Sequence, residues 1–265
     1  MRLMAWLPFS LQIRVGAFIG FLSYHLARGR RHVCETNLRL CFPELSESER
    51  ANMVRKVFRS NGIGFVEICI AWCRDNEDFR DRVQFHGLEN LEAARAQGRG
   101  VLLFGAHLTT FEISGFLYSL VGELNCTYRA NDKNPLFDAF MFNGRRRLYK
   151  GLYERKDIRG AMRCLKQGRV LWYAPDQDYG AKHSVFAPFF GVPTATIVAT
   201  SRFARLNHSP VLMLTQRRNR QQKCWQIEFS PVIDNFPSDD DLIDATRMNE
   251  LLEAEIRKDP SQYLW

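Results

Sequence analysis

One histidine and one carboxylate stand close together after a short apolar run. The run 101–104 ends at Gly105, His107 follows, and Glu112 comes five residues later. An imidazole can remove a proton from a hydroxyl, and a carboxylate can hold its second nitrogen. On one continuous helix, residues five apart lie about 140° apart around the axis and do not meet. We therefore expect a strand that delivers His107 to the rim of a sheet and a helix that begins near Glu112.

The same segment has a second interpretation. Thr109 and Glu112 have the spacing of a capping box, in which Thr109 caps the helix and Glu112 reaches back to its backbone. His107 would then be an ordinary loop residue. The segment alone does not separate this interpretation from acid/base chemistry.

Two further polar clusters follow predicted strands. Arg129 comes directly after one strand and Arg145 stands in an arginine run further on, while Asp176 follows another strand in an acidic loop. Sites in α/β folds lie at strand ends, so we expect these side chains to converge with His107 on one rim. That layout suits acyl or phosphoryl transfer. The arginine run has an alternative interpretation as a solvated helix face.

The sequence lacks the motifs of several classes of enzyme and cofactor-binding protein. There is no G-x-S-x-G elbow, no phosphate-binding G-x-x-x-x-G-K-[ST] and no G-x-G-x-x-G, so neither a covalent nucleophile nor a nucleotide cofactor is indicated. The seven cysteines form no C-x-x-C pair, which argues against a disulfide framework or a zinc site and fits a reducing environment. His107, Asp176 and Asp178 could hold a metal, but their spacing is not that of a ligand set, and we expect none.

Strands and helices alternate from Val83 onward. This order predicts an α/β fold, a central mixed β-sheet flanked by helices, in one domain over residues 31–265. Two helices are expected in 31–74, the second of them capped by Ser46 and Glu49. The predicted strands are 83–86, 101–106, 125–128, 170–174, 211–215 and 225–229, and the predicted helices are 88–96, 111–121, 136–148, 158–166, 196–205 and 240–257. The apolar stretch 186–193 is expected to be a buried loop or a surface that touches acyl chains.

Residues 1–30 form a helical segment of their own. Arg14 interrupts its apolar residues, and the clean run that follows is short of the ~20 residues that span a bilayer. We expect the segment to associate with a membrane interface, with Arg28, Arg30 and Arg31 meeting anionic lipid. A core helix of a soluble protein is the alternative. No small-residue cleavage site suggests a signal peptide.

Positive charge is concentrated in particular regions. The net charge is +8, and residues 129–169 alone carry twelve basic and four acidic residues. Such regions suit anionic partners, among them lipid headgroups, sugar phosphates, an acidic protein or nucleic acid. Solvated helix faces are the alternative explanation.

From about Arg31 to the last residue, the chain resembles the late acyltransferases of lipid A biosynthesis, and its lauroyltransferase branch most. Six blocks in consistent order carry the resemblance: 105–112 (GAHLTTFE), 128–135 (YRANDKNP), 144–145 (GR), 173–180 (YAPDQDYG), 185–191 (VFAPFFG) and 260–265 (PSQYLW). Between His107 and Glu112, many relatives have Gly-Asn-Trp where this chain has Leu-Thr-Thr-Phe.

The resemblance implies an acyl-carrier-protein-dependent O-acyltransferase. It would transfer a fatty acyl group to a hydroxyl of an acyl chain on the Kdo-bearing lipid IVA precursor, in lipopolysaccharide biosynthesis at the cytoplasmic face of the bacterial inner membrane. The implied partners are acyl carrier protein, the lipid A precursor and the anionic membrane surface, without nucleic acid, and acyl carrier protein is co-substrate where no cofactor is expected. The alternatives are another acceptor, such as a glycerophospholipid, or an inactive membrane-surface binding protein.

The family's functional residues fall on His107, Glu112, Arg145 and Asp176, and Arg129 joins them as a substrate-binding candidate. We expect His107, oriented by Glu112, to take the proton from the acceptor hydroxyl without an acyl-enzyme. Amides at the start of the helix after Thr110, alone or together with Arg145, would meet the developing negative charge. Arg145 could instead grip a phosphate. Asp176 could orient Arg145 or a sugar hydroxyl, or close a turn.

Overall fold

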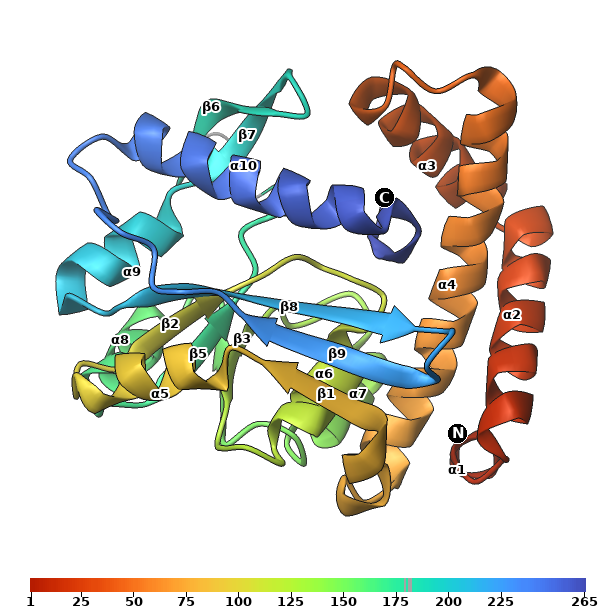
Figure 1. The fold of residues 1–265 in the computed structure, drawn as a ribbon, viewed down its shortest axis with the longest axis horizontal. Helices are drawn as coiled ribbons and strands as arrows, with labels where there is room; N and C mark the ends of the chain where they lie inside the picture. The colour runs from red at the N-terminus through yellow and green to blue at the C-terminus, as the bar shows by residue number, and fades with distance from the viewer. Residues whose placement is uncertain (179, 181–182) are drawn as a thin grey trace.

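A seven-stranded sheet forms the centre of the protein (Figure 1). The computed structural model describes residues 1–178, 180 and 183–265. Strand order across the sheet is β1-β9-β8-β2-β5-β3-β4. The pairs are parallel except β8–β9, which is antiparallel, so the predicted mixed α/β sheet is confirmed. The strands are β1 (Val83–His86), β2 (Val101–Phe104), β3 (Asn125–Tyr128), β4 (Gly151–Glu154), β5 (Val170–Tyr173), β8 (Val211–Asn219) and β9 (Cys224–Phe229).

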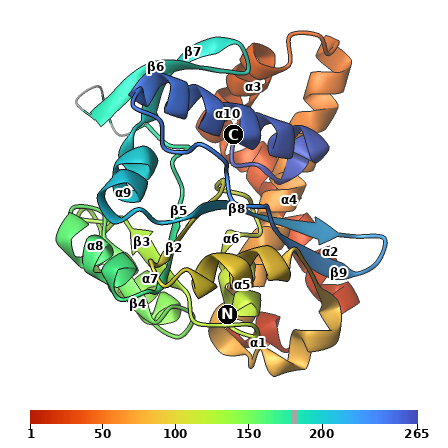
Figure 2. The ribbon, with the colours of Figure 1, turned by 60° about the vertical axis from the view of Figure 1, so that its left-hand side comes forward.

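Two hydrophobic cores lie on opposite faces of this sheet. Successive side chains of a strand point to opposite faces, so Val101 and Leu103 of β2 enter one core while Leu102 and Phe104 enter the other. Helices α5 (Leu88–Ala96) and α6 (Phe111–Tyr118) cover the first face. Helices α8 (Ile158–Lys166), α9 (Ala199–Asn207) and α10 (Asp241–Lys258) cover the second, as Figure 2 shows for α10 and α5. Because β2 is covered on both faces, its sequence is apolar throughout.

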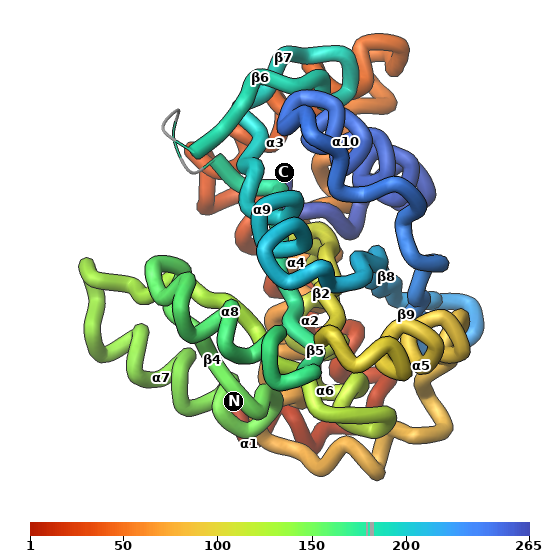
Figure 3. Tube along the Cα trace, turned by 90° about the vertical axis from the view of Figure 1, so that its left-hand side faces the viewer, coloured from red at the N-terminus to blue at the C-terminus, as the bar shows by residue number. Residues whose placement is uncertain are grey.

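The edge strand β4 lies at one end of the molecule. Helix α7 (Pro135–Arg145) connects β3 to β4, and Figure 3 shows α7, β4 and α8 grouped together. Strand β4 was not predicted, because its residues Gly-Leu-Tyr-Glu are half-buried and show no alternation. Its pairing with β3 supplies the strand signal that the sequence lacks.

Four helices precede the sheet: α1 (Arg2–Ala5), α2 (Phe9–Leu26), α3 (Arg28–Cys41) and α4 (Glu47–Cys73). The capping box expected at the start of α4 is present, with the Ser46 side chain accepting from the amide of Glu49 and Glu49 accepting from the amide of Ser46. Helices α2 and α4 run side by side in Figure 1. The long helix α4 therefore joins the N-terminal helices to the sheet domain.

Helix α2 contacts α4 through its smallest side chains. The buried residues of α2 are Gln12, Gly16 and Gly20, which share one face because they are four residues apart. A Cβ atom at Gly62 of α4 would lie 2.2 Å from the carbonyl oxygen of Gly16 and 2.3 Å from the nitrogen of Gly20. The two backbones thus touch, and only glycine fits at the contact.

The large apolar side chains of α2 face outwards instead. Phe18 is 60% exposed and Leu26 78% exposed, with Phe21 and Leu22 on the same outer side. This distribution is the reverse of an ordinary surface helix, whose apolar face packs inward. None of the described helices has both the length and the hydropathy needed to cross a bilayer.

A β-hairpin replaces the loop expected around residues 186–193. Strands β6 (Ser184–Phe189) and β7 (Val192–Ile197) pair antiparallel, and Pro188 lies opposite Pro193. The two prolines argued against a strand, but in a two-stranded hairpin they can occupy positions where no ladder hydrogen bond is needed. Because β7 extends to Ile197, helix α9 begins at Ala199 rather than at the predicted Thr196.

From the α2–α4 contact, we predict that replacement of glycine by alanine affects the free energy of unfolding differently at Gly62 and at Gly29. Gly62→Ala should lower the free energy of unfolding by about 1–3 kcal/mol, because the added methyl group meets backbone atoms that cannot move aside. Gly29→Ala should leave it unchanged or raise it by up to about 1 kcal/mol, since nothing lies within 4 Å of a Cβ there. Urea denaturation of both variants measures the difference, and equal stabilities would show that the helices do not touch at Gly62.

Candidate active site

His107 and Asp176 meet because their strands are neighbours. Strands β2 and β5 are parallel, and Phe104 pairs with Tyr173 at their carboxyl ends. His107 lies three residues after Phe104, and Asp176 lies three residues after Tyr173. The amide of Gly105 donates to the carbonyl of Tyr173 at 3.2 Å, so the two segments leave the sheet together. Because His107 and Asp176 lie the same number of residues after two paired residues, their side chains meet.

Two polar contacts join His107 and Asp176. Nδ1 of His107 lies 2.5 Å from Oδ1 of Asp176, and the amide of His107 donates to Oδ2 at 2.7 Å. An ionised carboxylate only accepts, so Nδ1 carries the proton, and in the neutral imidazole Nε2 is then the nitrogen with the lone pair. The Asp176 side chain is 1% exposed and that of His107 is 24% exposed. The imidazole is therefore held by a buried carboxylate while part of the ring reaches solvent.

Glu112 belongs to a second pair. It is the second residue of α6, and its Oε1 accepts from Nε of Arg145 at 2.8 Å and from a terminal nitrogen at 2.5 Å. The indole nitrogen of Trp72 donates to its other oxygen at 3.3 Å. Burial lowers the pKa of Arg145, but the charge and hydrogen bonds of Glu112 outweigh burial and raise this pKa above its ordinary value. The pair is a buried ion pair.

The predicted pairing of Glu112 with His107 is therefore wrong. Helix α6 directs Glu112 towards α4 and α7, where its carboxylate accepts hydrogen bonds from Trp72 and Arg145. The carboxylate that contacts His107 is that of Asp176. The expectation that Asp176 orients Arg145 fails for the same reason. The sequence carried one usable signal, since His107 and Asp176 each follow closely after a predicted strand, but only the observed strand order and strand ends show that the two residues meet.

The capping box proposed for Thr109 and Glu112 is also absent. Helix α6 begins one residue later, with Thr110 as its N-cap and no side-chain cap. The hydroxyl of Thr110 donates to the carbonyl of Gln216, and that of Thr109 lies 2.9 Å from the hydroxyl of Ser60. These hydroxyls tie the segment after His107 to β8 and α4.

A buried network supports this segment from behind. Arg218 of β8 donates from Nε to Glu67 of α4 at 2.6 Å and from a terminal nitrogen to Ser60 at 3.1 Å. Trp225 donates to the same carboxylate at 2.6 Å. Because Ser60 also contacts Thr109, an ion pair buried inside the protein positions the loop that carries His107.

Phe111 lies between the two pairs. Its ring centroid is 6.2 Å from that of His107 and 4.7 Å from that of Trp172, and the guanidinium of Arg145 is 5.5 Å from its centre. The aromatic ring packs beside the imidazole and separates it from the Glu112–Arg145 pair. An apolar neighbour of this kind keeps water away from one side of His107.

Basic residues continue along the same edge of the sheet. Strands β2, β5, β3 and β4 are mutually parallel, so their carboxyl ends share one edge. Arg129 follows β3 and is exposed, while Arg155 and Lys156 follow β4. The amide of Arg155 donates to the carbonyl of Tyr128 at 2.8 Å, which joins the two strand ends. Arg129 thus follows a strand end on the same edge as His107, whereas the Arg145 side chain, which is 14% exposed, is held by Glu112.

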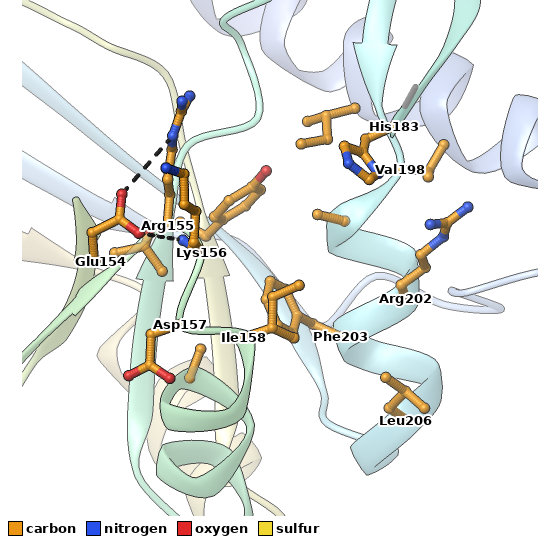
Figure 4. A pocket seen from close by; sticks show the side chains of 15 residues that line it. Glu154, Arg155, Lys156, Asp157, Ile158, His183, Val198, Arg202, Phe203 and Leu206 are labelled. Atoms are coloured by element: carbon orange, nitrogen blue, oxygen red, sulfur yellow. Dashed lines mark hydrogen bonds and ion pairs between the residues drawn. The ribbon is translucent and has the colours of Figure 1, made fainter. Parts of the chain in front are cut away.

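A cavity of about 530 Å³ opens on this edge, between the start of α8 and the side of α9 (Figure 4). Tyr173 lines it and precedes Asp176 by three residues. Its walls include the apolar residues Ile158, Ala161, Ile197, Val198, Phe203 and Leu206. Its charged lining comes from Glu154, Arg155, Lys156, Asp157 and Arg202, with His183 nearby, and none of these was predicted to bind substrate. The cavity suits an apolar chain with an anionic group.

No group of three or more potential metal ligands occurs among the described residues. His107 instead has one carboxylate partner, and its free nitrogen can accept a proton. A buried carboxylate that orients a partly exposed histidine is the arrangement of a general base. Fold and site together define an α/β protein with a histidine held by a buried carboxylate at the carboxyl edge of its sheet.

Comparison with known proteins narrows this class. A family model described as bacterial lipid A biosynthesis acyltransferase matches residues 1–265, and the chain belongs to that family. It is 37% identical over 264 residues to a lipid A biosynthesis lauroyltransferase of Escherichia coli K12, covering 99% of this chain and 86% of that protein.

Two further relatives from Escherichia coli K12 differ in the acyl group that they are named for. A lipid A biosynthesis palmitoleoyltransferase is 35% identical over 260 residues, covering 98% of this chain and 84% of that protein. A lipid A biosynthesis myristoyltransferase is 31% identical over 253 residues, covering 95% and 77%. The resemblance found in the sequence is confirmed.

The buried Glu112–Arg145 pair predicts a non-additive effect on stability. Glu112→Gln leaves a buried guanidinium without its countercharge and should lower the free energy of unfolding by about 3–5 kcal/mol. Adding Arg145→Met removes the uncompensated charge, so the double variant should be more stable than Glu112→Gln alone. Urea denaturation of the two single variants and the double variant gives the coupling, and additive losses would contradict an ion pair between these residues.

Proposed function

We propose that this protein transfers a fatty acyl group from acyl carrier protein to a hydroxyl on an acyl chain of the Kdo-bearing lipid IVA precursor. The single observation that carries the proposal is the His107–Asp176 contact at the open edge of the sheet, in a chain of the lipid A acyltransferase family. No cofactor is needed for this reaction, because the thioester of the donor supplies the activated acyl group.

His107 acts as the general base in this proposal. Nε2 takes the proton from the acceptor hydroxyl, and the hydroxyl oxygen attacks the thioester carbonyl of the donor. The imidazolium that forms is stabilised by Asp176, which already lies 2.5 Å from Nδ1. When the carbon–sulfur bond breaks, the proton can pass from Nε2 to the departing thiolate. The acyl group moves directly from donor to acceptor, without a covalent enzyme intermediate.

Helix α6 supports the same step electrostatically. It begins four residues after His107, so the partial positive charge of its N-terminus lies near the reacting carbonyl. Negative charge that develops on the carbonyl oxygen is stabilised there. Arg145 contributes through its pair with Glu112, which holds α7 against α6, rather than as the free phosphate ligand expected from the sequence.

The cavity between α8 and α9 is the proposed site of the donor's acyl chain. Its aliphatic and aromatic walls match a hydrocarbon, and Tyr173 links it to the segment that carries Asp176. Burial of each methylene group stabilises a bound chain by about 0.8 kcal/mol. Lys156 and Arg202, both exposed at the cavity, can bind the phosphate of a phosphopantetheine arm.

Acyl carrier protein is acidic, and the edge that carries Arg129, Arg155 and Lys156 is its proposed docking surface. Opposite charges speed the encounter of two proteins and orient them. The outward apolar face of α2, with Arg28 and Arg30 just beyond it, is the proposed contact with the anionic inner membrane at its cytoplasmic face. This surface brings the site to the lipid acceptor.

The general-base role predicts the effect of removing the imidazole. His107→Ala should lower turnover at least about 100-fold, with little change in acceptor binding. The assay incubates purified protein with acyl-carrier-protein donors and the tetra-acylated, Kdo-bearing precursor, and mass spectrometry identifies the product. His86→Ala, an exposed histidine on the opposite edge strand β1, is the matched control. Near-normal turnover of His107→Ala would end the general-base proposal, and wild-type transfer to a glycerophospholipid only would reassign the acceptor.

The basic edge predicts a change in the Michaelis constant for the donor. Lys156→Glu combined with Arg129→Glu should raise KM for the acyl-carrier-protein donor about three- to tenfold at low salt while kcat changes little. The difference should shrink as salt increases, because exposed charges are screened. Lys223→Glu, in the turn between β8 and β9, is the control for a general loss of positive charge. An unchanged KM in the double variant would place the docking surface elsewhere.

A further inference from the structure

Residues 259–265, which we call the strap, follow α10 and run along the loop that carries His107. The amide of Thr109 donates to the main-chain carbonyl of Gln262 at 2.7 Å, and the amide of Leu264 donates to the carbonyl of His107 at 3.1 Å. An isolated antiparallel bridge lies between these two bonds. The two peptide groups that follow His107 are therefore bound to the strap.

The side chain of Gln262 ties the strap to the sheet. It is 2% exposed, and its oxygen accepts from the amide of Arg218 in β8 at 2.9 Å. Its nitrogen donates to the carbonyl of Arg218 at 3.1 Å and to Oδ2 of Asp259 at 2.7 Å. A side-chain amide has two N–H donors and one acceptor oxygen, so each of these groups has a partner inside the protein. Because an unpaired polar group is costly when buried, this arrangement holds the amide in one orientation.

Arg218 holds the same loop by a second route. Its guanidinium donates to Ser60 of α4 at 3.1 Å, and the Ser60 hydroxyl lies 2.9 Å from the hydroxyl of Thr109. Thr109 is thus fixed at its hydroxyl through α4 and at its amide through the main chain of Gln262. Both routes lead back to Arg218, which is itself paired with Glu67.

The other end of the strap is packed among aromatic rings. The ring centroid of Trp265 is 5.6 Å from that of Phe42 and 6.0 Å from that of Phe190. Its indole nitrogen donates to the carbonyl of Pro260 at 2.8 Å, which closes the strap on itself. The strap is therefore held on both sides of the bonds that it makes with the His107 loop.

We infer that Gln262 is a positioning residue for the proposed acyl transfer, which fixes the backbone of the His107 loop relative to β8. The inference rests on the proposed general-base role of His107. Asp176 holds the amide and Nδ1 of His107 from one side, and the strap holds the peptide groups that follow it from the other. Nε2 keeps a single direction towards the acceptor hydroxyl only while both attachments are present. A reacting group displaced by about 1 Å can lose on the order of 100-fold in rate.

The test replaces the amide group by an apolar chain of similar length. Gln262→Met should lower kcat about tenfold, while KM for donor and acceptor changes less than about twofold, because the base is displaced and the binding surfaces are not. Asn249→Leu is the matched control. Asn249 is also a buried amide, and it donates to the carbonyl of Pro188 and the hydroxyl of Thr196, which ties α10 to the β6–β7 hairpin instead of to the His107 loop. The control should lose stability and keep kcat near that of the wild type.

A double variant shows whether Gln262 acts through the histidine. Once His107→Ala has removed the base, Gln262→Met should lower the residual turnover no further, since there is no imidazole left to position. A tenfold loss in both backgrounds would overturn the inference, because the two residues would then act independently. An equal loss of kcat in Asn249→Leu and Gln262→Met would overturn it as well.

A second measurement does not depend on activity. In hydrogen exchange of the full chain, the amides of Thr109 and Leu264 should exchange at least about tenfold faster in Gln262→Met than in the wild type, because the strap no longer holds them. Asn249→Leu should leave both amides as protected as in the wild type. Unchanged exchange at both amides together with an unchanged kcat in Gln262→Met would overturn the inference.

A milder variant serves if Gln262→Met does not fold. Asp259→Ala removes one of the three hydrogen bonds of the Gln262 amide group and should lower kcat about threefold, with faster exchange at Thr109. Wild-type kcat and wild-type exchange in this variant would then overturn the inference. If the wild type transfers no acyl group, the proposed function fails, while the exchange rates still decide whether Gln262 holds the His107 loop.

Discussion

The parallel pairing of β2 with β5 is the constraint on which the site depends. It aligns Phe104 with Tyr173, so two loops leave the sheet at the same level and place His107 against Asp176. Both strands are buried on both faces by helices, which is why the register cannot slip by a residue without turning apolar side chains into the wrong core. The packing of the two cores thereby fixes the position of His107 relative to Asp176.

Polar contacts between elements far apart in sequence maintain that geometry. Glu67 and Arg218 form an ion pair inside the protein, and through Ser60 it reaches the loop after His107. Glu112 and Arg145 form a second pair that holds α6 and α7 together. Each would be costly if one partner were missing, so each favours a single arrangement of the helices around the site. The loop that carries His107 is therefore held by polar contacts that lead back to a buried ion pair.

Two parts of the outer surface differ in chemical character. Helix α2 contacts α4 through glycines and turns its phenylalanine and leucine side chains away from the protein, which is suited to a lipid interface. The edge of the sheet beyond Asp176 carries exposed basic residues beside a cavity with apolar walls. In the proposed function, a membrane lipid contacts the first surface and an acidic acyl carrier protein contacts the second.

Local patterns in the sequence accounted for most of the elements. Buried runs such as 101–104, the capping box at Ser46 and the spacing of apolar residues depend on neighbours within a few positions, and the ordered blocks of residues pointed to the family. Strand β4 was missed because its pairing with β3 creates it. The hairpin β6–β7 was missed although its pairing is local, because Pro188 and Pro193 are unusual residues in a strand. The partners of His107 and Glu112 were likewise beyond local reasoning. His107 lies 69 residues from Asp176, and Glu112 lies 33 residues from Arg145, so strand order and helix packing decided the partner of His107 against the nearby Glu112 that the sequence had favoured.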